Sequence, residues 1–131
     1  IPYVNTNRLY LYMSYQEGHL PGLRLKVQYA GDSWIFWDEA EVKVDGKKMS
    51  LLGMGKVVRD NDAGLVWETT DSPIDGRHDG ANNLAVMRKI ATSKTTVIRL
   101  SGDKRKDRTI TSKEKKSMRD ILAAYDALML N

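Results

Sequence analysis

The chain has no cysteine, only two histidines and a single phenylalanine among its 131 residues. The lack of cysteine excludes a disulfide framework, a thiol nucleophile and a zinc site with thiolate ligands. Two histidines leave few ways to build a Ser-His-Asp triad, and the sequence contains no G-x-S-x-G motif. The phosphate-binding patterns G-x-x-x-x-G-K and G-x-G-x-x-G do not occur either. We therefore find no catalytic signature in the sequence and expect no cofactor.

Long apolar runs are also missing. The densest apolar stretch, residues 34–37, is only as long as a short strand, whereas a membrane helix needs about 20 apolar residues. We expect no transmembrane segment in this chain. The first residue is Ile1, so a removed signal peptide or lipoprotein leader, or a trimmed start, would fit.

The overall composition is typical of a folded domain. Hydrophobic residues make up 41% of the chain and charged residues 29%, in a mass of 14.8 kDa. This balance argues against disorder, and the length predicts one domain over residues 1–131. A chain of this size buries enough surface to fold without metals or disulfides.

The first half of the chain alternates between apolar and polar residues, which predicts strands. The expected strands cover residues 8–15, 23–29, 34–36 continuing at 41–44, 47–52, 56–59 and 65–69. Asp45-Gly46 predicts a two-residue hairpin turn, because a type I′ turn needs positive φ at both centres. Residues 60–64 are expected to form the next loop.

The second half changes to a helical period. We expect a helix over 82–92, a strand over 95–100, a charged loop over 101–110 and a C-terminal helix over 112–129. Thr111 and Glu114 fit a capping box at the start of that last helix, with Lys115, Lys116 and Arg119 on its solvent side. The predicted fold class is α+β and strand-rich, an antiparallel sheet or sandwich of about six to seven strands.

Three stretches look familiar when taken together. They are 29–36 (YAGDSWIF), 59–68 (RDNDAGLVWE) and 97–116, which runs from VIRLSGD to RTITSKEKK. They resemble an uncharacterised bacterial domain family found in secreted proteins and predicted lipoproteins, over roughly residues 23–128. The resemblance implies an extracytoplasmic setting, secreted or lipid-anchored through a removed leader, while a cytoplasmic location stays open. It assigns no activity and no active site.

The formal net charge of +4 is concentrated between residues 103 and 120, where eight bases face four acids. Such a region could bind phosphate backbones or an anionic surface, or could simply be a solvated helix face. No aromatic residue lies within it, so a stacking platform for single-stranded nucleic acid is missing. The candidate binding residues here are Lys104, Arg105, Lys106, Arg108, Lys115 and Lys116.

Tyr10 and Tyr12 form a second candidate site. In the expected strand they point away from Leu9 and Leu11, so they lie on the other face of the sheet. Tyrosine is enriched at interfaces, although a second layer could also cover this face.

The sequence signals for the other candidate sites are weaker. Asp60 and Asp62 are weak metal candidates, because Asp60, Asp62 and Gly64 match half of a calcium loop whose twelfth position here is Asp71 rather than Glu. A hairpin turn is the alternative for this segment. Three further groups have a functional and a structural interpretation. The acids Asp38, Glu39, Glu41 and Glu68 could contain a catalytic carboxylate pair or be exposed acids, and Trp34, Trp37 and Trp67 could form a binding platform or part of the core. His19 and His78 could each be a catalytic base or a turn residue.

These observations favour a non-catalytic binding module that engages a protein or an envelope polymer. The alternative is a binder of nucleic acid or anionic surfaces that uses the basic region over 104–119. The third hypothesis is a hydrolase that uses carboxylates between Asp60 and Asp79.

Overall fold

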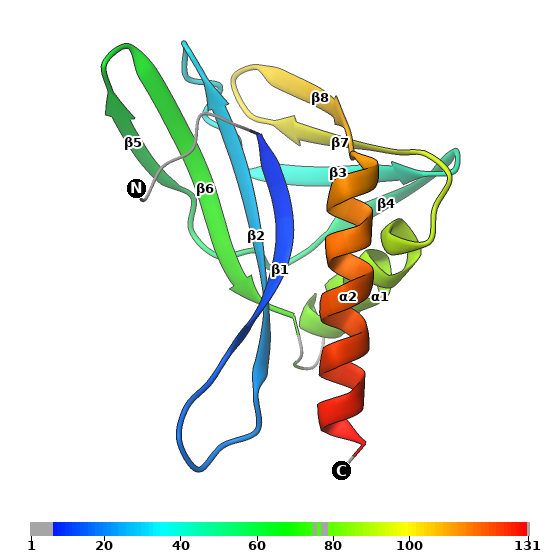
Figure 1. The fold of residues 1–131 in the computed structure, drawn as a ribbon. Coiled ribbons are helices and arrows are strands. Elements are labelled where there is room, and N and C mark those ends of the chain that lie inside the picture. Colours follow the sequence, from blue (N-terminus) through cyan, green and yellow to red (C-terminus); the bar gives the residue numbers. More distant parts are fainter. Residues whose placement is uncertain (1–6, 75, 77–78, 131) are drawn as a thin grey trace.

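The computed structural model of the chain describes residues 7–74, 76 and 79–130. In these residues it contains eight strands and two helices (Figure 1). In chain order they are β1 (Arg8–Ser14), β2 (Gly22–Gly31), β3 (Glu39–Val44), β4 (Lys47–Leu51), β5 (Val58–Asp62), β6 (Leu65–Pro73), α1 (Asp79–Ala91), β7 (Thr96–Ser101), β8 (Arg105–Thr109) and α2 (Ser112–Met129). The predicted strand-rich α+β fold is thereby confirmed.

The strands form two four-stranded antiparallel sheets, with the orders β1-β2-β6-β5 and β4-β3-β7-β8. The chain passes from the first sheet to the second after β2, returns for β5 and β6, and passes back after α1. Helices α1 and α2 pack against each other; α2 lies beside β1 and α1 beside β4 (Figure 1). Neither helix has the length and apolar character needed to cross a membrane.

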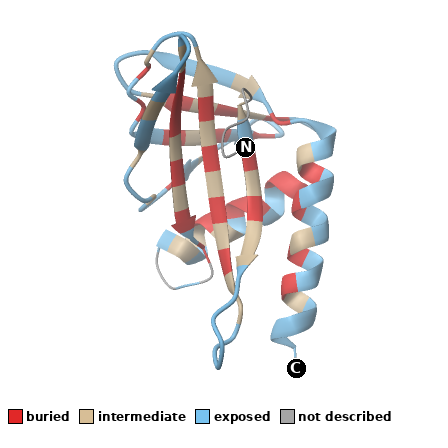
Figure 2. Ribbon diagram, turned by 60° about the vertical axis from the view of Figure 1, so that its left-hand side comes forward, coloured by how far each residue is buried: buried red, intermediate tan, exposed pale blue. Residues whose placement is uncertain are grey.

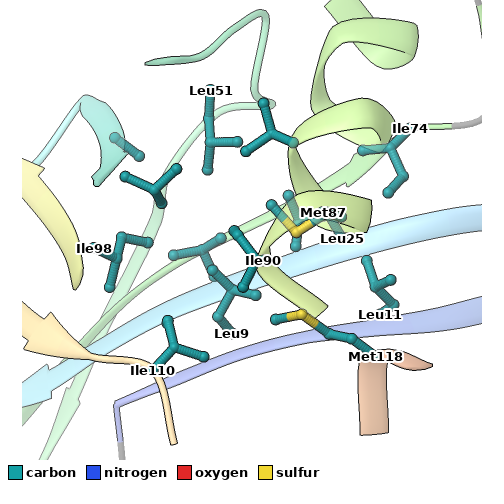
Figure 3. Close-up of a cluster of buried hydrophobic side chains, with 14 of the residues drawn as sticks. Leu9, Leu11, Leu25, Leu51, Ile74, Met87, Ile90, Ile98, Ile110 and Met118 are labelled. Carbon is teal, nitrogen blue, oxygen red and sulfur yellow. The ribbon is translucent and has the colours of Figure 1, made fainter. Parts of the chain in front are cut away.

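The hydrophobic core lies between the two sheets and the helices. Buried and partly exposed residues alternate along the strands, as a sheet with one core face requires (Figure 2). Met87 and Ile90 of α1 and Met118 of α2 meet Leu11 and Leu25 of the first sheet in this cluster (Figure 3). All five side chains are at most 3% exposed.

Two hairpin turns depend on left-handed backbone. Asp45 and Gly46 have φ angles of 48° and 88°, which confirms the predicted two-residue turn between β3 and β4. Ala63 and Gly64 form a similar turn between β5 and β6, with φ angles of 51° and 81°. The expected loop over 60–64 is therefore shorter than predicted, because β5 continues to Asp62.

Two element predictions are wrong, and the predicted helix over 82–92 is present with different bounds. Residues 34–36 are not a strand, because Phe36 has a left-handed φ of 53° that breaks extended geometry. The charged segment over 101–110 contains β8, whose backbone pairs with β7 although its side chains are mostly exposed. Helix α1 begins at Asp79 and ends at Ala91 rather than covering 82–92.

Side chains from the two helices cover one edge of each sheet. The Leu9 amide in β1 donates to Glu114 Oε2 of α2 at 2.9 Å. Beyond β4, Asn83 of α1 accepts from the Leu52 amide at 2.9 Å and donates to its carbonyl oxygen at 2.6 Å. These contacts replace the hydrogen bonds that a further strand would supply at an open edge.

The predicted capping box at the start of α2 is confirmed. The Glu114 amide donates to Thr111 Oγ1 at 3.1 Å, and the Thr111 amide donates to Glu114 Oε1 at 3.0 Å. Arg108 also donates to both oxygens of Glu114, at 2.6 and 2.9 Å. Burial alone would raise the pKa of Glu114, but the hydrogen bonds from Arg108, Thr111 and Leu9 outweigh it and hold the pKa below its usual range.

Candidate binding surfaces

The first candidate surface is the side of the β1-β2-β6-β5 sheet that points away from the core. Strand register places its side chains in rows across β1, β2 and β6, so that Tyr10 lies next to Lys26 and Lys26 next to Asp71. We call this surface the tyrosine face. Its members are Arg8, Tyr10, Tyr12, Arg24, Lys26, Gln28, Thr69 and Asp71.

Tyr12 is held by a three-residue network on this face. Its hydroxyl donates to Asp71 Oδ2, and Arg24 Nε donates to Asp71 Oδ1 at 2.8 Å. Burial and the neighbouring Asp71 carboxylate raise the pKa of Tyr12. Burial alone would raise the pKa of Asp71, but hydrogen bonds from Tyr12 and Arg24 hold it below its usual range. The tyrosine therefore stays protonated and the aspartate stays charged at neutral pH.

Tyr10 is ordered by two neighbours. The Arg8 guanidinium carbon lies 4.5 Å from the centroid of the Tyr10 ring, within cation–π range. The Tyr10 and Tyr12 ring centroids are 6.2 Å apart with an interplanar angle of 42°. The structure thus places both predicted tyrosines on the side opposite Leu9 and Leu11, partly exposed and with restricted orientations.

A shallow hollow of about 330 Å³ opens beside these tyrosines, between β2, β6 and the segment that leads into β5. We call it the β5 hollow. Trp67 of β6 lines it and is 5% exposed. The other lining residues are Lys26, Gln28, Lys56, Val58, Asp60, Thr69, Thr70 and Asp71.

The predicted basic region is divided by the fold, and the expectation that Lys115 faces solvent is wrong. Lys115 is 9% exposed, and its Nζ donates to the carbonyl oxygens of Ser93 and Lys94 at 3.2 and 3.0 Å. Helical periodicity alone did not reveal this, because the long side chain reaches the end of the α1–β7 connection. Arg108 is paired with Glu114, so neither residue offers a free cation.

The other bases of this region are partly held by neighbouring groups and partly exposed. Lys116 pairs with Asp120 at 2.9 Å, and Arg119 donates to the Ala91 carbonyl oxygen at 2.7 Å. Three candidates, Lys104, Arg105 and Lys106, are exposed at the β7–β8 hairpin. Fewer bases of this region are therefore available to contact a ligand than the sequence suggests.

Aromatic residues from a distant segment lie beside this hairpin. Trp34 and Phe36 stack with ring centroids 5.9 Å apart, and the Arg59 guanidinium lies 5.5 Å from the Phe36 centroid. The Lys104 amide donates to the Ile35 carbonyl oxygen at 3.3 Å, which fixes the two segments together. Phe36 is 46% exposed. The sequence does not single out Phe36, because a bulky residue at positive φ is uncommon.

The buried carboxylate of Glu68 explains the conformation of this segment. Glu68 is 0% exposed and accepts from the amides of Ile35 and Trp37 at 2.8 and 3.1 Å. Arg59 Nε donates to the same carboxylate at 3.0 Å. The Glu68 carboxylate thus holds the loop that contains Phe36 in place. This arrangement does not resemble a catalytic pair.

Three of the other predicted acids lie together, whereas the tryptophans separate in space. Asp38, Glu39 and Glu41 line a larger hollow of about 570 Å³ together with Arg99 and Arg105. Trp37 is 1% exposed in the core, so the three tryptophans do not form one platform. The hydrolase hypothesis stays a prediction, although the lowered pKa of Asp71 is opposite to the raised pKa that a general acid needs.

The weak metal candidates lie on one strand. Asp60 and Asp62 belong to β5, two residues apart on the same face. Within the described residues there is no cluster of three or more side chains suited to a metal ion. His19 lies exposed in the β1–β2 turn, whereas His78 falls outside the described residues.

Comparisons with protein-family models, with curated proteins and with solved structures find no match to this chain. The functional argument therefore depends on the geometry of these surfaces.

Proposed function

We propose that this chain is a non-catalytic binding module of a bacterial secreted protein or lipoprotein. It engages a protein or an envelope polymer through the tyrosine face. The extracytoplasmic setting rests on the resemblance of residues 29–36, 59–68 and 97–116 described above.

The observation that carries this proposal is the ordering of Tyr10 and Tyr12 on a face that points away from the core. Hydrogen bonding to Asp71 fixes Tyr12, and Arg8 covers one side of Tyr10. Rings that are already ordered lose little conformational entropy on binding, so more of their contact energy appears as affinity. Tyrosine and arginine are also the residue types enriched at the centres of binding sites.

Replacing both tyrosines, Tyr10→Ser and Tyr12→Ser, should abolish capture of the partner, because it removes the two ordered rings of the tyrosine face. The test immobilises the wild-type chain and the variant, exposes both to bacterial envelope extract and identifies bound material by mass spectrometry. Lys43→Ser with Lys48→Ser, on the outward side of the other sheet, is the matched control and should retain capture. A species bound at stoichiometric yield by the wild type and equally by the tyrosine variant would contradict the proposal.

Folding must be checked alongside capture, because Tyr12 donates a partly buried hydrogen bond. Tyr12→Phe keeps the ring and removes only the hydroxyl. We expect it to cost about 1 kcal/mol of stability and to retain capture. Thermal denaturation followed by circular dichroism separates this loss from a loss of the binding surface.

A second candidate function is binding of single-stranded nucleic acid at the β7–β8 hairpin, the alternative raised by the basic region. The observation that favours it is the stacked Trp34–Phe36 pair beside Lys104, since bases stack on such rings. It ranks second because Asp32, Asp38 and Asp103 lie in the same segments and offset the bases.

This second function predicts a steep salt response. If about three phosphates are neutralised, affinity for a fluorescent oligonucleotide should fall roughly twentyfold between 50 and 200 mM salt. Fluorescence anisotropy measures this directly, and Phe36→Ser should weaken binding further by removing one stacking surface. An affinity that does not change with salt would rule out this function.

A further inference from the structure

We infer that the β5 hollow and the adjoining tyrosine face bind an anionic saccharide, a chain of sugar rings that carry carboxylate groups. This inference rests on the proposed function and specifies its ligand.

The first argument is charge. Four bases, Arg8, Arg24, Lys26 and Lys56, meet three acids, Asp60, Asp62 and Asp71, on the outward side of this sheet and in the hollow. Asp71 is already paired with Arg24. Among the described residues Arg8, Lys26 and Lys56 form no ion pair with a carboxylate. The surface therefore carries positive charge that an anionic ligand would neutralise.

The second argument is the mixture of rings and polar groups. Tyr10 and Tyr12 are partly exposed rings, whereas Trp67 lines the hollow with only 5% of its surface exposed. Sugar rings present apolar C–H faces that pack on aromatic rings, and their hydroxyl groups need hydrogen-bonding partners at the edge. Gln28 and Thr69 supply an amide and a hydroxyl at the hollow, already linked by a hydrogen bond of 3.1 Å.

The third argument concerns size and reach. A volume of about 330 Å³ is at the lower end of small-molecule sites, which span roughly 300–1,000 Å³. The hollow is therefore suited to part of a ligand. Two strand spacings, about 10 Å, separate β6 from β1, so a chain seated in the hollow extends over Lys26 to reach Tyr10.

A peptide is a poorer fit to the same surface. Peptides are commonly anchored by an apolar side chain in a pocket or by strand addition at a free edge. Val58 is the one aliphatic side chain among the described residues that line the hollow. The neighbouring β5 edge carries Arg59, Asp60 and Asp62, and charges of this kind discourage strand addition.

The test uses isothermal titration calorimetry with a short galacturonate oligosaccharide as the probe. We expect saturable binding to the whole chain that weakens as salt is raised. Lys26→Gln with Lys56→Gln should weaken it about tenfold or more, since charge-assisted hydrogen bonds are lost. The matched control, Lys43→Gln with Lys48→Gln, removes the same charge from the other sheet and should leave the affinity unchanged.

Two further probes identify the ligand class. The carboxyl-reduced, neutral form of the same oligosaccharide should bind much more weakly, and poly-glutamate of similar charge should not compete. Equal competition by poly-glutamate would overturn the inference in favour of an acidic peptide. Absence of galacturonate binding, or equal binding by the Lys26/Lys56 variant, would overturn it as well.

Failure of this inference and failure of the proposed function can be told apart. If galacturonate does not bind but Tyr10→Ser with Tyr12→Ser still loses the captured species, the ligand class is wrong and the binding face is right. If capture is also unaffected by the tyrosine changes, the proposed function is wrong too.

Discussion

Replacing Glu68 by alanine should destabilise the folded chain by about 3–5 kcal/mol. The side chain is completely buried and satisfies the amides of Ile35 and Trp37 and the guanidinium of Arg59. Alanine would leave two buried amides without acceptors and a partly buried cation without its partner. Each unsatisfied group carries its own desolvation penalty, so the costs accumulate at one site. Urea denaturation of wild type and variant gives the difference directly.

Glu39→Ala is the matched control, because this glutamate is exposed on the neighbouring sheet. Surface changes of this kind normally stay within about 0.5 kcal/mol of wild type. Arg59→Ala should cost less than Glu68→Ala, since the carboxylate would keep two amide donors. A Glu68→Ala variant as stable as Glu39→Ala would show that the carboxylate does not hold the loop.

Gly102→Ala should destabilise the chain by about 3 kcal/mol, the upper part of the range for overpacking. An added Cβ would lie 2.0 Å from the Phe36 carbonyl oxygen and 2.7 Å from Trp37 Cα. Both atoms belong to the backbone, so no side-chain rotation relieves the clash. The loop that displays Phe36 would have to move away from the β7–β8 hairpin. Thermal and urea denaturation should both report the loss.

Gly80→Ala provides the contrast within the same chain. Gly80 lies in the first turn of α1, and an added Cβ would come no closer than 3.5 Å to Ile74. Alanine loses less backbone entropy than glycine on entering a helix, so the change should be neutral or stabilising by up to about 1 kcal/mol. If both glycine variants behaved alike, the close approach at Gly102 would not be a determinant of stability.

Regular periodicity made the strand and helix elements predictable. Alternation along residues 23–29 identified most of β2, and the capping box with its apolar spacing identified α2 from Ser112 to Met129. The strand prediction for residues 34–36 is wrong, because three apolar residues in a row are typical of a buried strand. The left-handed Phe36 depends on Glu68 and Gly102, which are distant in the sequence. No local signal contains that information.

The candidate surfaces, too, were predictable only where they depend on one segment of the sequence. Alternation was enough to place Tyr10 and Tyr12 opposite Leu9 and Leu11. The β5 hollow was not foreseen, because it needs the register of β2, β6 and β5 together. Lys115 was assigned to solvent since its carbonyl partners, Ser93 and Lys94, belong to another segment.

The contact between the Leu9 amide and Glu114 joins residues 105 positions apart in the chain. During synthesis at about 5–20 residues per second, β1 emerges roughly 5–20 s before the residue that covers its edge. Throughout that interval the strand exposes backbone groups that could pair with another nascent copy. The edge of β1 therefore stays uncovered until α2 is present, and a chain that lacks α2 should associate through this edge.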